Sequence, residues 1–239
     1  MQLLLVIFLL EPISILELPL RCTRIENYEE MNYLLQENNR AIIRIDTARN
    51  VLSIPVEGGV NNRIYGFDLT PFSIYLNMKG GLFKLSINSG LIEKIYTGDV
   101  VSFTLNDAEE IILAERFKKE VLFLDSQYKI RLIKSNFNVV DMDYFDKRIY
   151  VLTRKEIIVF DEYGNMIERI KIPEKKERIV VRGKVYLFTP AQKTVLRKDK
   201  EWDSIQLNHP FIDLKITEKN VLTLNQYGDT LYIYDRSDF

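Results

Sequence analysis

The stretch RIYVLTRKEIIVFDEYGNMIERI, from Arg148 to Ile170, decides the fold. It contains two apolar runs separated by a short polar loop, then Asp161, a turn with Gly164, and a third run in which apolar and charged residues alternate. Alternation with a period of two residues, bounded by turn-forming residues, is typical of β-strands rather than helices. The stretch therefore predicts a β-hairpin followed by another antiparallel strand.

The same pattern recurs along nearly the whole chain. Each repeat contains an apolar run that ends in Asp or Ser, and we call this last residue the anchor. A second apolar run lies about twelve residues before the anchor, and a further apolar stretch precedes the hairpin that the two runs form. With the alternating run that follows the anchor, each repeat has four strands in about 37 residues. Asp at the anchor is expected to accept hydrogen bonds from backbone amides of the following turn. The anchors, at spacings of 40, 39, 36, 38 and 36 residues, end the runs AIIRID at Asp46, LFKLS at Ser86, VLFLD at Asp125, IIVFD at Asp161, VLRKD at Asp199 and LYIYD at Asp235.

Four short antiparallel strands cannot bury their faces alone, but six such sheets can when they pack radially, as in a β-propeller. The repeats thus predict an all-β, six-bladed β-propeller of four-stranded antiparallel blades, with residues 11–239 as a single domain. The last repeat stops after three strands, whereas ISILELP (Ile13 to Pro19) resembles ERIKIP (Glu168 to Pro173). We therefore expect an N-terminal strand at about residues 12–18 to complete the last blade and close the ring.

The pattern resembles that of the six-bladed NHL-repeat propellers, and Arg148 to Ile170 carries the resemblance best. There, strand, short loop, a strand ending in Phe160-Asp161, Gly164 and a final strand follow the family's order. The fifth and sixth repeats fit moderately, the third loosely, and the first two only through their anchors and spacing. Such propellers include protein-binding and RNA-binding modules, sugar-acid lactonases and carbon–nitrogen lyases. The resemblance thus implies a blade and leaves the activity open.

Composition excludes several classes of function. The 239 residues include 33 Lys plus Arg and 34 Asp plus Glu, so a net charge of −1 advertises neither a polyanionic nor a polycationic partner. A single cysteine, Cys22, and a single histidine, His209, exclude intramolecular disulfides, zinc fingers and Cys/His nucleophile pairs. No phosphate-binding Gly-rich loop or nucleophile elbow is present. We therefore name no catalytic residue and no cofactor, apart from the calcium ion considered below.

The amino terminus carries an unbroken apolar run, LLLVIFLL, at residues 3–10. It is much shorter than the roughly 20 residues of a membrane-spanning helix, but it has the length of a signal-peptide core. No basic residue precedes it and no small-residue cleavage site follows it, so residues 1–10 are either a truncated export signal or a buried amino-terminal strand. We predict an exported or periplasmic protein, with a cytoplasmic one as the alternative, and no bundle of transmembrane helices.

One position in each repeat lies eight residues before the hairpin and, in a propeller, near the innermost strand. We call the set of these positions the acidic column. Its consecutive carboxylates Asp141, Glu177 and Asp213 recur every 36 residues. Facing one another across a channel, they would raise each other's pKa or together hold a hard cation such as Ca²⁺. The resemblance also implies such a site, because metal-dependent lactonases of this type hold calcium or zinc at the channel mouth. The other interpretation is solvated or backbone-bonded acids beside the pore. The remaining members of the column are Glu26, Gly66 and Phe103.

Basic residues gather in the loops between the second and third strands of the repeats, which should open on one face. The loops on the opposite face are more acidic, so a nearly neutral chain can still have one positive side that attracts an anionic partner. Solubilising surface charge is the other interpretation. The candidate partner-binding residues are Arg40, Lys79, Arg116, Lys118, Lys119, Arg154, Lys155 and Lys193.

These observations lead to a non-enzymatic scaffold that binds a protein or an extended ligand through loops on one face of a monomeric propeller. One alternative is a calcium-assisted hydrolase or lactonase with its acidic site at the channel. Another is cytoplasmic binding of RNA or another anion through the basic loops, although no stacking aromatics or base pockets are recognisable in the sequence. Nucleic acid is therefore the less favoured partner.

Overall fold

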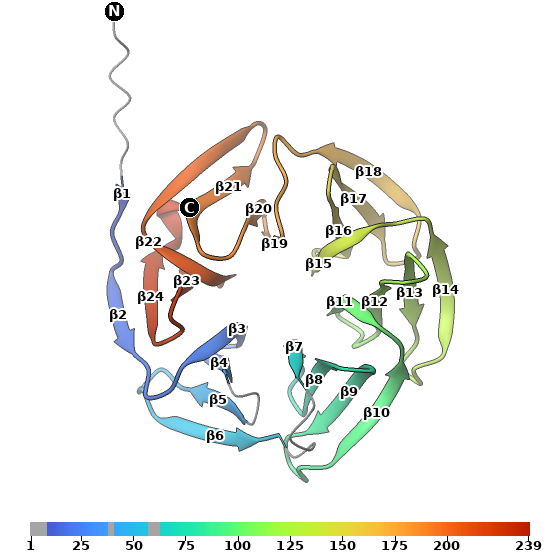
Figure 1. Ribbon diagram of the computed structural model, residues 1–239, viewed down its shortest axis with the longest axis horizontal. Coiled ribbons are helices and arrows are strands. Elements are labelled where there is room, and N and C mark those ends of the chain that lie inside the picture. The colour runs from blue at the N-terminus through green and yellow to red at the C-terminus, as the bar shows by residue number, and fades with distance from the viewer. Residues whose placement is uncertain (1–8, 38–40, 57–62) are drawn as a thin grey trace, which may run out of the picture.

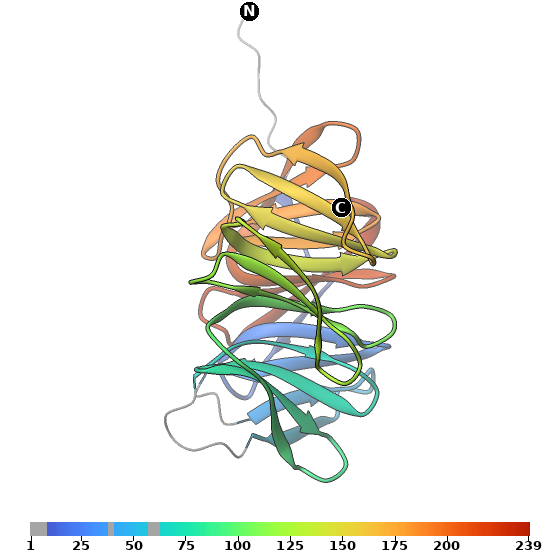
Figure 2. The same ribbon diagram turned by 90° about the vertical axis from the view of Figure 1, so that its right-hand side faces the viewer.

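The computed structural model describes residues 9–37, 41–56 and 63–239, whose strands form sheets arranged in a ring (Figure 1). The side view shows the strands running between the two faces of the ring, where the connecting loops lie (Figure 2). A single 3-10 helix, η1 (Arg236–Asp238), follows the last strand in this part of the chain. None of the described helices is long and apolar enough to cross a membrane.

Four repeats form separate four-stranded antiparallel sheets, each starting with its innermost strand. The alternation of apolar and polar residues places one row of side chains on each face of a sheet. The four sheets consist of β3 (Cys22–Tyr28), β4 (Met31–Gln36), β5 (Ala41–Ile45) and β6 (Val51–Pro55); β7 (Ile64–Leu69), β8 (Ser73–Met78), β9 (Gly81–Ser86) and β10 (Ile92–Thr97); β11 (Val100–Leu105), β12 (Ile111–Glu115), β13 (Glu120–Leu124) and β14 (Ile130–Ser135); and β15 (Val139–Phe145), β16 (Arg148–Thr153), β17 (Glu156–Asp161) and β18 (Met166–Lys171).

The last two repeats form one continuous sheet of eight strands instead of two separate blades. Its long strand β22 pairs with β21 through Trp202 to Gln206 and with β23 from Phe211 onward. The linking residues LNHP belong to this strand, and the register with β21 is irregular across them. The prediction of six separate blades is therefore wrong. The sheet contains β19 (Arg178–Arg182), β20 (Lys184–Phe188), β21 (Gln192–Lys198), β22 (Trp202–Ile216), β23 (Asn220–Asn225), β24 (Thr230–Asp235), β2 (Ser14–Glu17) and β1 (Leu9–Leu10).

The two ends of the chain meet in this sheet. Strand β2 pairs antiparallel with β24, and the flanking amides of Ile13 and Leu18 donate to the carbonyls of Ile233 and Asp229, each at 2.8 Å. The predicted closing strand at about residues 12–18 is confirmed. Leu10 packs on the core, and β1 adds to β22 in parallel at Gln206 and Leu207, so the end of the apolar N-terminal run belongs to the sheet. The rest of that run, residues 1–8, lies outside the described residues.

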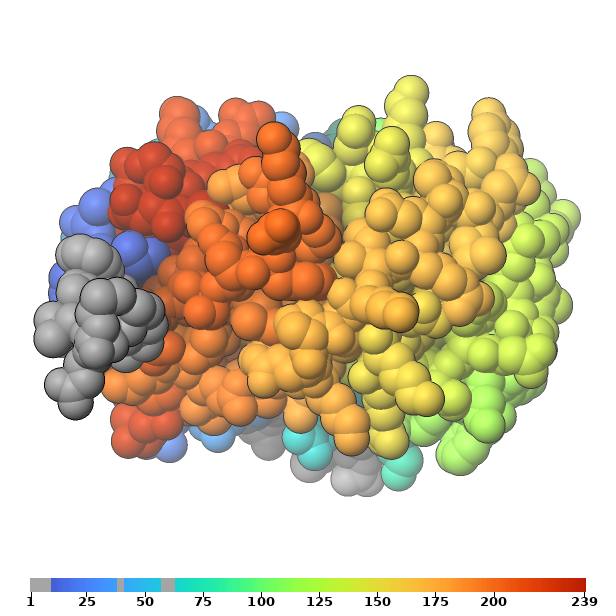
Figure 3. Space-filling model, turned by 90° about the horizontal axis from the view of Figure 1, so that it is seen from above, coloured from blue at the N-terminus to red at the C-terminus, as the bar shows by residue number. Residues whose placement is uncertain are grey.

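The hydrophobic core lies between neighbouring sheets. One cluster, for example, joins Val121 and Phe123 of β13 to Val151 of β16 and Phe160 of β17. Similar clusters fill the spaces between the other neighbouring sheets. One of them includes residues of β18, β21 and β22, and the segments that carry these strands lie side by side on the rim (Figure 3). Radial packing of this kind buries both faces of each sheet, which a single four-stranded sheet cannot achieve.

Most of the anchor aspartates fix turns, as expected. The Asp46 carboxylate accepts from the amide of Asn50 at 2.8 Å, and Asp161 accepts from that of Asn165 at 2.7 Å. Asp125 and Asp235 accept in the same way from the amides of the residues that follow them. The pKa of Asp161 is lowered because these bonds to the charged form outweigh the effect of its slight burial.

Candidate functional site

The innermost strands bring six side-chain positions together at one mouth of the channel. Five of these strands carry a β-bulge near their start, where the pairing with the second strand skips a residue. A bulge re-aims the side chain that follows it. Arg178 of β19 occupies the equivalent position. The amide of the next residue, Ile179, donates to Asp141, just as the amide of Ile25, which follows Arg24, donates to Asp213. We call this set the mouth ring: Arg24, Gly66, Ser102, Asp141, Arg178 and Asp213.

The acids of the mouth ring bind the backbone of neighbouring strands. Oδ2 of Asp141 accepts from the amide of Ile179 in β19 at 3.1 Å, and Oδ2 of Asp213 accepts from the amide of Ile25 in β3 at 2.8 Å. Asp141 also accepts the hydroxyl of Ser102 at 2.7 Å. Both carboxylates are buried. They therefore hold adjacent inner strands together.

The three predicted calcium ligands are not brought together. Glu177 is exposed, and the next residue, Arg178, takes the inward position instead. Its guanidinium lies between the other two acids, 3.6 Å from Asp141 Oδ1 and 3.7 Å from Asp213 Oδ1. Among the described residues, no group of three or more His, Cys, Asp or Glu side chains is placed to hold a metal ion. The constant spacing placed Glu177 at the inward position of this repeat, but the residue that points inward is Arg178, one residue later.

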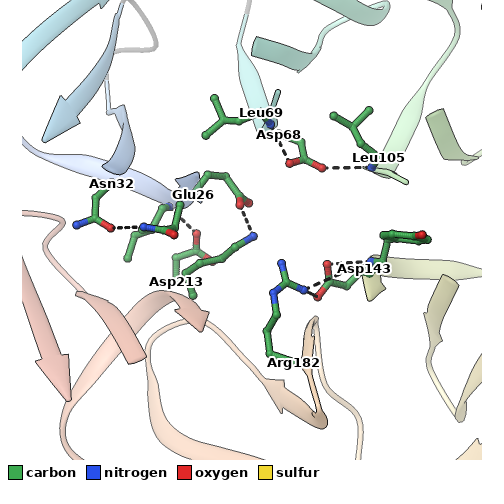
Figure 4. A network of polar contacts seen from close by, with 12 residues as sticks. Glu26, Asn32, Asp68, Leu69, Leu105, Asp143, Arg182 and Asp213 are labelled. Carbon is green, nitrogen blue, oxygen red and sulfur yellow. Dashed lines mark hydrogen bonds and ion pairs between the residues drawn. The ribbon is translucent and has the colours of Figure 1, made fainter. Parts of the chain in front are cut away.

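The other end of the channel carries a second layer of charges (Figure 4). Lys215 forms an ion pair with Glu26, and Arg182 lies 3.3 Å from a carboxylate oxygen of Asp143. Burial raises the pKa of Glu26 to about 7 although Lys215 opposes the rise. Asp68 accepts from the amides of Leu69 and Leu105, at 2.8 and 3.3 Å, and burial raises its pKa as well. Between the two layers lies a cavity of about 90 Å³.

The basic loops border a much larger cavity of about 990 Å³ on the face of the mouth ring. Three predicted partner-binding residues line it, namely Arg116, Arg154 and Lys155. The sequence interpretation missed three more arginines, Arg24 and Arg178 from inner strands and Arg169 from β18. Arg24 and Arg178 could have been identified from their position in the repeat, which is equivalent to that of Asp141 and Asp213. We call this space the arginine cavity.

The other predicted basic residues lie outside the arginine cavity. Lys118 is 2.9 Å from Glu115, and Lys79 and Lys119 are exposed in their loops. Lys193 belongs to strand β21 rather than to a loop, and its ammonium donates to the carbonyl of Asn208. Arg40 lies outside the described residues. The predicted basic face is thus concentrated on the third and fourth repeats.

The opposite face has two cavities with mixed linings. One, of about 950 Å³, is bordered by Glu29, Glu30 and Asp46 together with Arg49 and Lys219. The other, of about 530 Å³, is bordered by Asp107, Glu109 and Asp146 with Arg182 and Lys215. Acidic loops therefore gather on this face, as the sequence predicted, but they lie beside basic residues.

The single histidine, His209, lies within β22. Its ring stacks on Tyr232 with 3.7 Å between centroids, Nδ1 lies 3.0 Å from the Tyr234 hydroxyl and Nε2 lies 3.0 Å from Oγ1 of Thr223. Burial, and then the charge of Lys193, lower the pKa of His209 to about 4. The histidine is therefore held neutral by packing, and it does not border the channel cavity.

The fold and the channel define an all-β propeller-type protein. No family model matches the chain, and no curated protein does. Virginiamycin B lyase from Staphylococcus aureus is similar in structure, with 12% identity, a TM-score of 0.65 and coverage of 93% of this chain and 87% of that chain. YCF48 bound to a D1 peptide has 12% identity, a TM-score of 0.62 and coverage of 90% and 77%. PorZ, a surface component of the type-IX secretion system of Porphyromonas gingivalis, has 9% identity, a TM-score of 0.61 and coverage of 91% and 37%. At these identities the likeness concerns the fold.

Proposed function

We propose that this chain is a non-enzymatic scaffold that binds an acidic segment of a protein partner in the arginine cavity. The observation that carries the proposal is the lining of that cavity, where six Lys or Arg residues meet three acidic ones, with the further acids Asp141 and Asp213 beside Arg178. A concave surface with an excess of one charge attracts a partner of the opposite charge and speeds its association. The rigid blades hold the loops in place, so binding costs little ordering of the scaffold.

The pairing of charges inside the cavity supports the proposal. Arg116 lies 3.1 Å from Asp99, and Arg169 lies 2.7 Å from Glu156. Arg154 and Lys155, in contrast, are exposed and have no carboxylate within 4 Å in the part of the chain that the structure describes. Two adjacent cations without partners are the feature that a negatively charged segment would neutralise.

A peptide as ligand is also consistent with the fold. In the similar YCF48 structure, a propeller of comparable architecture is bound to a D1 peptide. The arginine cavity, at about 990 Å³, has room for several residues of an extended segment. We favour protein over RNA because the described lining has few aromatic rings: Tyr65 borders it, and Phe137 packs edge-on against Phe160. Single-stranded RNA relies on stacking rings as well as on positive charge.

A difference from the similar lyase is consistent with the proposed binding function. A solved variant of the similar S. aureus lyase, with a histidine replaced by alanine, is described as catalytically inactive and was obtained with quinupristin. In this chain the single histidine, His209, is stacked on Tyr232 and contacts Tyr234 and Thr223. The described residues around the channel therefore offer charged groups but no imidazole for proton transfer.

The test is binding of a fluorescent acidic heptapeptide, acetyl-Gly-Glu-Asp-Gly-Glu-Asp-Gly, measured by anisotropy at low salt. Arg154→Glu combined with Lys155→Glu should weaken binding at least tenfold, because it turns two attractive charges into repulsive ones. Lys79→Glu combined with Lys193→Glu changes the net charge equally, lies outside the cavity and should weaken binding less than twofold. Equal effects of the two pairs would contradict the proposal. Tighter binding of a seven-nucleotide single-stranded RNA than of the peptide would favour RNA instead.

We also keep export of the chain as part of the proposal, since the apolar run at residues 3–10 has the length of a signal core, although Leu9 and Leu10 at its end pair with β22 in the structure. Intact mass and compartment in the native host test it. A cleaved product outside the cytoplasm would support export and restrict the partners to envelope or secreted proteins. A full-length cytoplasmic product would refute it, and the acidic partner would then be sought in the cytoplasm.

A further inference from the structure

The guanidinium of Arg178 contacts two carboxylates of the described residues only at distances longer than a normal hydrogen bond. Its side chain is only 23% exposed, and its contacts with Asp141 and Asp213 are 3.6 and 3.7 Å long. Both exceed the range of about 2.7–3.2 Å for N–H···O hydrogen bonds. The two carboxylates cannot swing closer without cost, since each already accepts a backbone amide. A partly buried guanidinium whose N–H groups lack close acceptors can donate hydrogen bonds to an oxygen ligand.

Arg24, separated from Arg178 in the mouth ring by Asp213, also lacks a close carboxylate partner. Its Nε donates to the carbonyl of Tyr65 at 3.2 Å, and no carboxylate of the described residues lies within 4 Å of its guanidinium. Burial lowers the pKa of Arg24, and the positive charge of Arg178 lowers it further. Two cations held near one another, each without a close carboxylate partner among the described residues, form a site for a group that accepts from both.

There is room for such a group. Gly66, in the mouth ring next to Tyr65, has no side chain, and a Cβ placed there would meet no atom within 4 Å. Gly66 and Arg178 both border the cavity of about 90 Å³ in the channel. Tyr65 and Arg178 border this cavity and the arginine cavity alike, so the small space is a recess of the larger one.

We propose that the channel mouth binds one carboxylate group between Arg24 and Arg178, in the space left open at Gly66. Asp141 and Asp213 balance the charge of the arginines, so the incoming group is held by hydrogen bonds from the guanidinium donors rather than by a large net charge. That the carboxylate belongs to an acidic residue of a protein partner rests on the proposed function. The site itself would equally accept a free small carboxylate.

An internal ligand tests the site without any partner. Gly66→Glu places a carboxylate in the open space, and Gly66→Gln places an uncharged side chain of the same size there. Neither should disturb the fold, because the position has free space and does not require a left-handed backbone. If the site accepts a carboxylate, the melting temperature of Gly66→Glu should exceed that of Gly66→Gln by about 3 °C or more. A value for Gly66→Glu equal to or below that of Gly66→Gln would overturn the inference.

A binding experiment separates this inference from the proposed function. The Nε–Hε signals of Arg24 and Arg178 are followed by NMR while acetate or the acidic heptapeptide is added. Shifts of both signals, with affinity for the peptide falling about tenfold in Arg24→Gln and about tenfold in Gly66→Glu, are the expected result. Equal saturation by acetate and peptide supports the site and assigns it to free carboxylates, against the proposed function. Peptide binding that leaves both signals unchanged overturns the site and leaves the proposed function standing. The absence of any shift with either probe overturns the site as well.

Discussion

Oδ2 of Asp213 accepts a hydrogen bond of 2.8 Å from the backbone amide of Ile25, 188 residues earlier in the chain. The bond joins the last inner strand to the first, at the centre of the ring, while β2 and β24 join the same two ends at its rim. Asp141 and Asp143 make equivalent bonds to the amides of Ile179 and Val181. Asp141, Asp143 and Asp213 therefore hold neighbouring inner strands together.

Asp213→Ala should lower the free energy of unfolding by about 2–3 kcal/mol, because it leaves the buried amide of Ile25 without an acceptor and Arg178 with one fewer counter-charge. Denaturation in urea measures the loss. Asp199→Ala is the control, since Asp199 is exposed, and it should change stability by less than about 0.5 kcal/mol. Ca²⁺ should not shift the melting temperature of either variant. Stabilisation of the unmodified protein by Ca²⁺, absent from Asp213→Ala, would show that the acids bind a cation after all.

Leu16→Asp should weaken the pairing of β2 with β24, which closes the ring. Leu16 is half-buried in β2 and packs on the cluster that contains Leu224 and Leu231, so a charge there costs about 2–4 kcal/mol. The matched control is Ile15→Asp, at a neighbouring residue that is 54% exposed, with an expected cost below about 1 kcal/mol. Hydrogen exchange of β24 amides reports the opening. Equal protection of β24 in both variants would show that β2 contributes no packing to the closure.

Stability should fall as the pH rises from about 4.5 to about 7 through the contribution of Glu26. Its folded pKa is raised to about 7 by burial, from an ordinary value of 4.5, so in this range the folded state keeps a proton that the unfolded state has lost. Each unit of difference is worth about 1.4 kcal/mol. Glu26→Gln should remove this part of the pH dependence, measured by urea denaturation from pH 4 to 8. An unchanged slope between the two proteins would mean that Glu26 titrates normally.

His209 should contribute in the opposite direction. Its folded pKa is lowered to about 4 from an ordinary value of 6.5, so the unfolded state binds the extra proton as the pH falls and stability is lost between about 6.5 and 4. NMR titration of the imidazole should give a midpoint near 4, and binding of the acidic heptapeptide should be unaffected by His209→Gln. A midpoint near 6.5 would contradict the buried, neutral state of the ring.

The strand pattern and the closing strand could be predicted because each depends on local residues. The alternation in Ile13 to Pro19 matches that in Glu168 to Pro173, and both segments become outermost strands of their sheets. The merging of the last two blades could not be predicted, since DSIQL and FIDLKI each look like a complete strand. Whether the chain turns or stays extended at LNHP depends on pairing partners on both sides, Thr194 to Lys198 and Val221 to Asn225.

The candidate site was only partly visible in the sequence for a similar reason. Loop residues such as Arg116 and Arg154 were identified because loop charge is a local property. Arg24 and Arg178 were missed because the column was counted from the hairpins, which placed Glu26 and Glu177 in it instead. Arg178 directly follows Glu177, and a one-residue change in register turns a side chain to the other face of a strand. Arg24 lies two residues before Glu26 on the same face of β3, so it lies further along the channel rather than on the other face. The difference replaced acids by arginines in the mouth ring and changed the expected ligand from a cation to an anion.

The central claim is that an acidic segment binds in the arginine cavity, and the most direct test is where such a segment lies. The acidic heptapeptide, carrying a photoreactive benzoyl group at its centre, is cross-linked to the full chain and the attachment points are found by mass spectrometry. The account predicts cross-links to Tyr65, Arg116 and the segment at residues 153–155, competed by unlabelled peptide. Cross-links confined to the opposite face, around Glu29 and Lys219, would contradict it.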